Sequence, residues 1–146
     1  MDYELTLTVP GEPMGKQRPR RASNIRGTYT PQKTLNYETL IKELFIIKYP
    51  DFKPIEGAVE ISIGIYLTIP KSKSKKKQEE MAMDTIKALK NPDVDNVLKI
   101  VMDALEGLAY RNDNQVVTAH PTKRWSNTPR IDIKIQDVEN VPWKFE

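Results

Sequence analysis

Hydrophobic and polar residues alternate along residues 59–69, which is the pattern of a β-strand with one buried face. The hydrophobic positions of this stretch are Val59, Ile61, Ile63, Ile65, Leu67 and Ile69. Shorter stretches at residues 5–9, 116–119 and 130–136 also predict strands. We therefore expect a sheet with one face toward a core and the other toward solvent or a second subunit.

Helical spacing of hydrophobic residues replaces this alternation in two other stretches. Residues 34–49 predict a packing helix with Thr34 as its cap, and residues 95–107 predict a helix that Asp95 caps and Gly107 ends. Residues 78–89 favour a helix more weakly. A chain of 146 residues suits one domain. The expected fold is a single α+β (mixed α/β) domain over residues 1–146, whose mixed sheet supports the helix at 95–107.

Composition excludes several classes of function. The chain has no cysteine, so disulfides, zinc fingers and thiol catalysis are excluded. It has no long apolar run, and Asp2 and Glu4 follow Met1 where a signal peptide would be basic and then apolar. We expect a cytoplasmic protein that has no membrane partner.

Positive charge is concentrated in two stretches, although the net charge is only +3. Residues 13–37 contain no acidic residue and have too little apolar surface to pack alone, which predicts a mobile arm. This arm either follows DNA phosphates or is a solvated loop that keeps the protein soluble. Residues 71–77 hold five lysines, which are either a solvated approach to a helix or a second phosphate-binding patch.

Candidate chemistry lies in residues 90–115. Asp93 and Asp95 precede the predicted helix, and an extended backbone there would point both side chains to one side. Lys99 and Asp103 continue a polar stripe along the helix, and Asp113 follows it. Carboxylates without cysteine or a nearby histidine favour Mg²⁺ or Mn²⁺. The alternative is that Asp-x-Asp is only a helix cap.

These residues resemble the signature of the RusA family of Holliday junction resolvases, the crossover junction endodeoxyribonucleases. The resemblance rests on Pro92, Asp93, Asp95, Asn96, Lys99, Asp103, Ala104, Leu105, Gly107, Asp113, Gln115 and Val116. It implies a Mg²⁺-dependent endonuclease that nicks four-way DNA junctions as a homodimer, with no small-molecule cofactor. Asp93, Asp95 and Asp113 match the metal-binding carboxylates, and Lys99 matches the essential lysine.

The same resemblance extends to basic residues elsewhere in the chain. Residues 13–20 are similar to the family's N-terminal Lys/Arg-Pro-Arg segment, which implies DNA contacts for Lys16, Arg18 and Arg20. Lys123 matches a basic position that follows the family motif, so we assign it to DNA as well. One departure is Asn112, where family members often carry a second aspartate.

The resulting hypothesis is metal-assisted hydrolysis of a phosphodiester. Lys99 would bear on the scissile phosphate or orient the water, and Asp103 either positions Lys99 or ends the polar stripe. Two rivals remain: a less selective nuclease acting on flaps or duplex DNA, and a DNA-binding module without catalysis. Trp125 and Trp143 are interpreted as packing residues, and His120 is expected to be structural or exposed.

Overall fold

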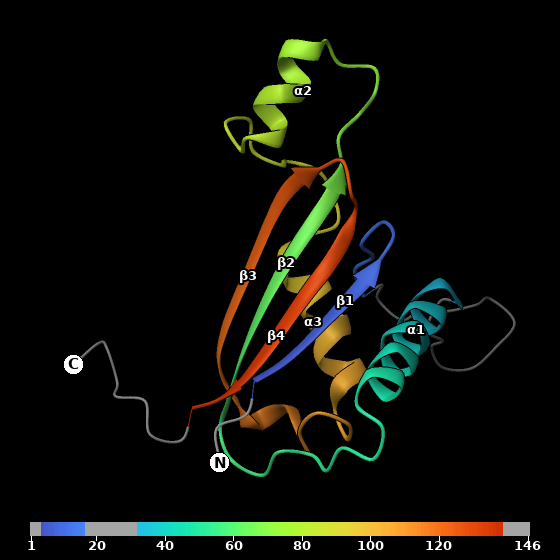
Figure 1. Ribbon diagram of the computed structural model, residues 1–146, viewed down its shortest axis with the longest axis vertical. Coiled ribbons are helices and arrows are strands. Elements are labelled where there is room, and N and C mark those ends of the chain that lie inside the picture. The colour runs from blue at the N-terminus through green and yellow to red at the C-terminus, as the bar shows by residue number, and fades with distance from the viewer. Residues whose placement is uncertain (1–3, 17–31, 139–146) are drawn as a thin grey trace, which may run out of the picture.

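Four strands form one mixed sheet in the computed structural model, which describes residues 4–16 and 32–138. The strands are β1 (Glu4–Pro10), β2 (Val59–Thr68), β3 (Val116–Ser126) and β4 (Arg130–Asp137). Their order is β1-β4-β2-β3, with β2 and β3 parallel and the other pairs antiparallel (Figure 1). Three helices complete the domain: α1 (Gln32–Lys48), α2 (Lys75–Ala82) and α3 (Val94–Leu105). The α+β class is confirmed.

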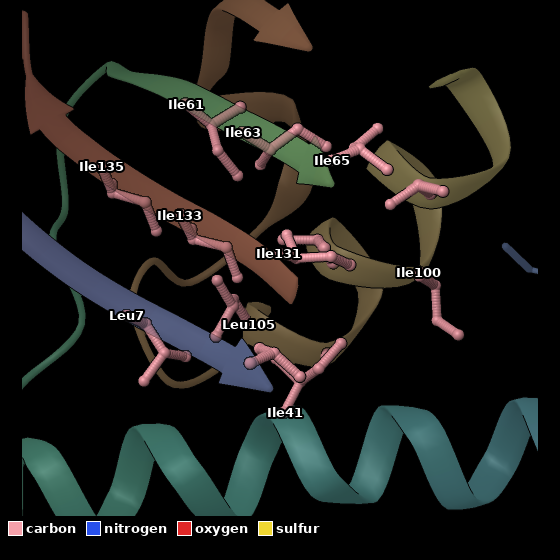
Figure 2. Packing of buried hydrophobic residues seen from close by; sticks show 14 of the residues in the cluster. Leu7, Ile41, Ile61, Ile63, Ile65, Ile100, Leu105, Ile131, Ile133 and Ile135 are labelled. Carbon is pink, nitrogen blue, oxygen red and sulfur yellow. The ribbon is translucent and has the colours of Figure 1, made fainter. Parts of the chain in front are cut away.

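The core lies between the sheet and the two longer helices, α1 and α3. Figure 2 shows isoleucines of β2 and β4 on the side of the sheet where Ile41 of α1 and Ile100 and Leu105 of α3 lie. All three helical residues are fully buried. Burying such a side chain contributes about 1.5–3 kcal/mol, so this apolar layer fixes how α3 sits on the sheet. The strict alternation of burial along β2 confirms the predicted strand.

The opposite face of the sheet is polar. The Nε2 of His120 on β3 lies 2.8 Å from a carboxylate oxygen of Glu60 on β2. The guanidinium of Arg130 lies 3.9 Å from the centre of the Tyr66 ring. Lys134 and Thr6 lie on this face as well. His120 is therefore an exposed surface residue, which is one of the two places expected for it.

β3 extends well beyond the predicted residues 116–119. The sequence His120-Pro121 argued for an early end, but β3 is an edge strand, and an edge strand accepts proline where no neighbour needs its N–H. Pro121 pairs in register with Ile63. The longer strand carries Lys123 and Trp125, which lie between the predicted strands.

Three predicted helix boundaries were wrong. α2 covers residues 75–82 instead of 78–89, because the Ser74 hydroxyl accepts from the N–H of Lys77 at 3.3 Å and Asp84 has a φ of 60°. Thr34 lies buried inside α1 instead of capping it. α3 begins at Val94, before Asp95. Figure 1 shows α2 projecting beyond the end of the sheet.

Within the described parts of the chain, no helix combines the length and the apolar character needed to cross a bilayer. Arg18, Arg20 and Trp143 lie outside these parts, as does most of the predicted basic arm.

Truncating the core should separate buried from exposed positions. We expect Ile100→Ala, at a fully buried site on α3, to lower the free energy of unfolding by about 2–5 kcal/mol through lost burial and a residual cavity. Ile47→Ala on α1, where the side chain is 75% exposed, is the matched control and should change it by less than about 0.5 kcal/mol. Urea denaturation measures both, and equal losses would contradict the described packing.

Candidate functional site

Acidic residues lie at both ends of α3. Asp93 is the N-cap residue, with extended backbone angles of φ −74° and ψ 149°, but its side chain makes no capping hydrogen bond. Asp95 lies in the first turn, so the predicted extended Asp-x-Asp arrangement is wrong at its second residue. The backbone turns helical directly after Asp93. Both side chains are exposed, and their charges are favourable at the positive end of the helix dipole.

The predicted polar stripe along α3 is confirmed. Asp95 and Lys99 are exposed and Asp103 is half-buried, whereas Val97 and Val101 face the core. At a rise of about 1.5 Å per residue, the eight steps from Asp95 to Asp103 span about 12 Å along the axis. Lys99 therefore stands midway between an acidic N-terminal end and an acidic C-terminal end of the helix.

A group of three close carboxylates lies at the C-terminal end of α3. It consists of Asp103, Glu106 and Asp113, from each of which one carboxylate oxygen lies within 4.8 Å of the other two. Among the residues that the structure describes, this group leaves out Asp93 and Asp95. Asp113 is the one predicted metal ligand within it. The joint assignment of Asp93, Asp95 and Asp113 to a single metal therefore stays a prediction.

The turn after α3 brings Asp113 back to the helix. Gly107 has a φ of 84°, which suits a residue without a side chain, and its N–H donates to the carbonyl of Tyr110 at 2.7 Å. Tyr110 is fully buried, and its hydroxyl donates to the carbonyl of Met102 at 2.6 Å. This fold-back sets the start of the short 3₁₀ helix Asp113–Gln115 beside the last turn of α3.

Asn112 holds this short helix in place. Its side-chain oxygen accepts from the N–H of Asn114 at 2.9 Å, and its own N–H donates to the side chain of Gln115 at 2.9 Å. The amide nitrogen of Gln115 in turn donates to the carbonyls of Ile55 and Gly57 at 2.7 and 2.8 Å. An aspartate could accept the same capping bond. Asn112 therefore preserves the local backbone although it departs from the pattern that the sequence resembles.

Lys16 connects the N-terminal segment to the acidic group. Its ammonium donates to Glu38 of α1 at 2.9 Å and also to Asp103. Its backbone N–H donates to the carbonyl of Asn96 in the first turn of α3 at 2.9 Å. Burial lowers the pKa of Lys16, but its hydrogen bonds with Asp103 and Glu38 outweigh this effect, so the pKa lies above its ordinary value. Lys16 is therefore a cation held among carboxylates.

Gly15 allows this approach. A Cβ atom at Gly15 would lie 2.9 Å from the Cβ of Asn96, closer than real Cβ atoms come, and 3.3 Å from that of Pro92, which is a tight contact. Only glycine lets the segment before Lys16 lie this close to the start of α3.

The electrostatics of the carboxylate group favour a bound cation. The last turn of α3 contains no basic residue, so Asp103 lies at the negative end of the helix dipole. Two carboxylates about 4 Å apart repel each other by roughly 4 kcal/mol at an effective dielectric of 20. Burial raises the pKa of Tyr110, and the charges of Glu106, Asp113 and Asp103 raise it further. Three carboxylates of this kind could hold a hard cation such as Mg²⁺ or Mn²⁺.

Glu106 was missed by the sequence analysis. It is the C-cap residue of α3, where acidic side chains are usually unfavourable, and its role depends on the turn that returns Asp113. The available signal was its spacing, because residues three apart on a helix are neighbours and Glu106 follows Asp103 by three.

The remaining predicted residues have defined places. The ammonium of Lys123 donates to the backbone carbonyls of Lys90 and Pro92, at 2.7 and 3.2 Å. Trp125 is buried with 6% exposure, which confirms its packing role.

Comparison with known proteins supports a nuclease family. The family model described as Endodeoxyribonuclease RusA matches residues 10–136, which include α3, the carboxylate group and strands β2 and β3. The chain is also 33% identical over 139 residues to the uncharacterized protein YqaN of Bacillus subtilis (strain 168). That alignment covers 92% of this chain and 96% of the relative.

Adding a side chain at Gly15 should disturb the docking of the N-terminal segment. We expect Gly15→Ala to lower the melting temperature by a few degrees, because a loss of about 1 kcal/mol shifts a domain of this size by roughly 2–8 °C. The cost should shrink in an Asn96→Gly background, where the clashing Cβ is absent. Differential scanning calorimetry of the four proteins tests the pair, and equal costs in both backgrounds would argue against the contact.

Removing the charge of Lys16 should strengthen cation binding. We expect Lys16→Met to bind Mn²⁺ about tenfold more tightly, because a lysine repels a divalent ion by about 1.4 kcal/mol at roughly 6 Å in a water-like dielectric. Isothermal titration with Mn²⁺ measures the change. Lys42→Met, at an exposed position of α1, is the control and should leave Mn²⁺ binding as it is. Weaker binding by Lys16→Met would mean that Lys16 supports the ligands.

Proposed function

Because the chain belongs to the RusA family of endodeoxyribonucleases, we propose that it resolves Holliday junctions, by paired symmetric nicks, in DNA recombination and repair. The observation that carries this proposal is the array of charges on the exposed side of α3. This array begins with Asp93, Asp95 and Lys99, and it ends with the carboxylate group that contains Asp113. All of these residues fall within the region that the family model matches.

The metal that we propose is Mg²⁺, with Mn²⁺ as a substitute, and Asp113 would be one of its ligands. The likeness to the family adds Asp93 and Asp95, whereas the geometry at the end of α3 adds Asp103 and Glu106. When bound, the ion supplies an activated water and stabilises charge on the phosphate. The two ligand sets predict different mutational results, so they can be separated.

The chain's own residues bind and orient the DNA in this proposal. Lys99 is exposed on α3 between the two acidic ends, where its ammonium would stabilise negative charge that develops on the scissile phosphate. Arg18 and Arg20 would contact DNA phosphates from the arm at residues 13–37. Asp103 pairs with Lys16, which gives it a partner on the N-terminal segment.

A homodimer belongs to the same proposal. A four-way junction has two-fold symmetry, and its resolution needs nicks on two opposed strands. Two copies of the chain related by a two-fold axis would supply two equivalent sites.

The first test is cleavage of an immobile four-way junction with Mg²⁺. We expect Lys99→Met to lower the cleavage rate at least about 100-fold, since losing one group that stabilises transition-state charge costs about 10²–10³ in rate. Asp113→Asn should lower the rate by at least as much, because it removes a ligand of the metal that activates the water. Asp113→Asn should still bind the junction, because it removes negative charge near DNA. Equally fast cleavage by Asp113→Asn would refute the site, and equal cleavage of a junction, a flap and a duplex of matched sequence would indicate a less selective nuclease.

A second comparison separates the two ligand sets. If Asp103, Glu106 and Asp113 hold the metal, Glu106→Gln should raise the Mg²⁺ concentration needed for half-maximal cleavage by about 10–100-fold, the loss typical of a disturbed metal site. If Asp93, Asp95 and Asp113 hold it, Asp95→Asn should have that effect and Glu106→Gln should not. Glu43→Gln on α1 is the control for the loss of one exposed acid.

A further inference from the structure

Two side chains of β3 reach the segment that leads into α3. Lys123 and Trp125 are two residues apart on the strand, so both project from the same face of the sheet. Their register partners on β2, Ile65 and Leu67, are buried in the core. Both side chains therefore point to the side of the sheet on which α3 packs, away from the polar face that carries His120.

Three backbone carbonyls of residues 87–92 receive hydrogen bonds from these two side chains. The ammonium of Lys123 donates to the carbonyl of Lys90 at 2.7 Å and to that of Pro92 at 3.2 Å. The indole N–H of Trp125 donates to the carbonyl of Lys87 at 3.2 Å. Between these anchors Ala88 is buried and Leu89 is 92% exposed, so the side chains of the segment contribute little packing of their own.

The anchored segment determines where Asp93 lies. The carbonyl of Pro92 belongs to the peptide that joins it to Asp93, whose own side chain makes no capping bond. On the other side, the N-terminal segment touches Pro92 and Asn96 through Gly15. The approach to α3 is thus held from the sheet by β3 and from outside by the N-terminal segment.

We infer that Lys123 and Trp125 are positioning residues, which fix the carbonyls of residues 87–92 and thereby the place of Asp93 at the start of α3. Lys123 then acts through the protein backbone, and the DNA contact that its place in the sequence suggested is not its main role. This inference rests on the proposed function only in the step from the position of Asp93 to cleavage. The hydrogen bonds from Lys123 and Trp125 to the carbonyls of residues 87–92, which we call the clamp, can be tested without DNA.

The first experiment compares amide hydrogen exchange in the free protein. Lys123→Met keeps the aliphatic stem and removes the donors. We expect amides of residues 88–96 to exchange at least about tenfold faster in this variant, because their local opening becomes easier. Trp125→Phe should accelerate exchange around residues 87–90. The matched control is Lys134→Met, which removes the same charge from the polar face of the sheet. Exchange in Lys123→Met that equals the control would overturn the inference.

The second experiment separates positioning from DNA contact. At saturating junction we expect Lys123→Met to lower the cleavage rate about tenfold or more, with the dissociation constant and its salt dependence unchanged. Lys123→Arg should recover part of the rate, because a guanidinium can donate to two carbonyls. A phosphate contact would instead weaken binding, reduce the salt slope by about one and spare the rate at saturation. That pattern would overturn the inference.

The two experiments also keep the inference apart from the proposed function. If the wild-type protein cleaves no junction, the proposed function fails, while faster exchange in Lys123→Met still supports the clamp. If the wild-type protein cleaves and Lys123→Met cleaves equally fast at saturation, the proposed function stands and the positioning role is overturned.

Discussion

The packing of α3 against the isoleucine layer of β2 and β4 determines the rest of this structure. Ile100 and Leu105 are fully buried in that layer, so the rotation of the helix about its axis is fixed. With one side of α3 committed to the core, Asp95, Lys99 and Asp103 can only face outward. The charged surface of α3 follows here from the core, because one helix carries both the apolar side and the charged side.

The carboxylates at the end of α3 repel each other, and a nearby lysine partly offsets this repulsion. Asp103, Glu106 and Asp113 gather where the helix dipole is also negative. Lys16 supplies one positive charge and links the group to Glu38 of α1. One cation among several carboxylates leaves the region negative, which is the condition under which a divalent ion binds and a phosphodiester can be brought close to it.

The sequence predicted those parts of the molecule that depend on local periodicity. The long alternation of β2 and the helical spacing of α3 required no tertiary information, and the polar stripe followed from the same spacing. The close approach of Glu106 and Asp113 depends on a turn at Gly107 and on the buried Tyr110, which no periodicity reveals. The contact of Lys16 with Asp103 joins residues 87 positions apart. The full length of β3 was hidden by Pro121, whose effect depends on whether the strand lies at an edge.

Because Lys16 lies on the N-terminal segment, the net charge around the acidic group depends on where that segment sits. The segment that carries Lys16 is tied to α3 through one backbone hydrogen bond and the close contact of Gly15. Shifting that segment by a few ångströms would withdraw a full positive charge from Asp103 and Glu38 without altering any acidic residue. The negative charge at this end of α3 thus depends on the position of the neighbouring N-terminal segment as well as on the acidic residues themselves.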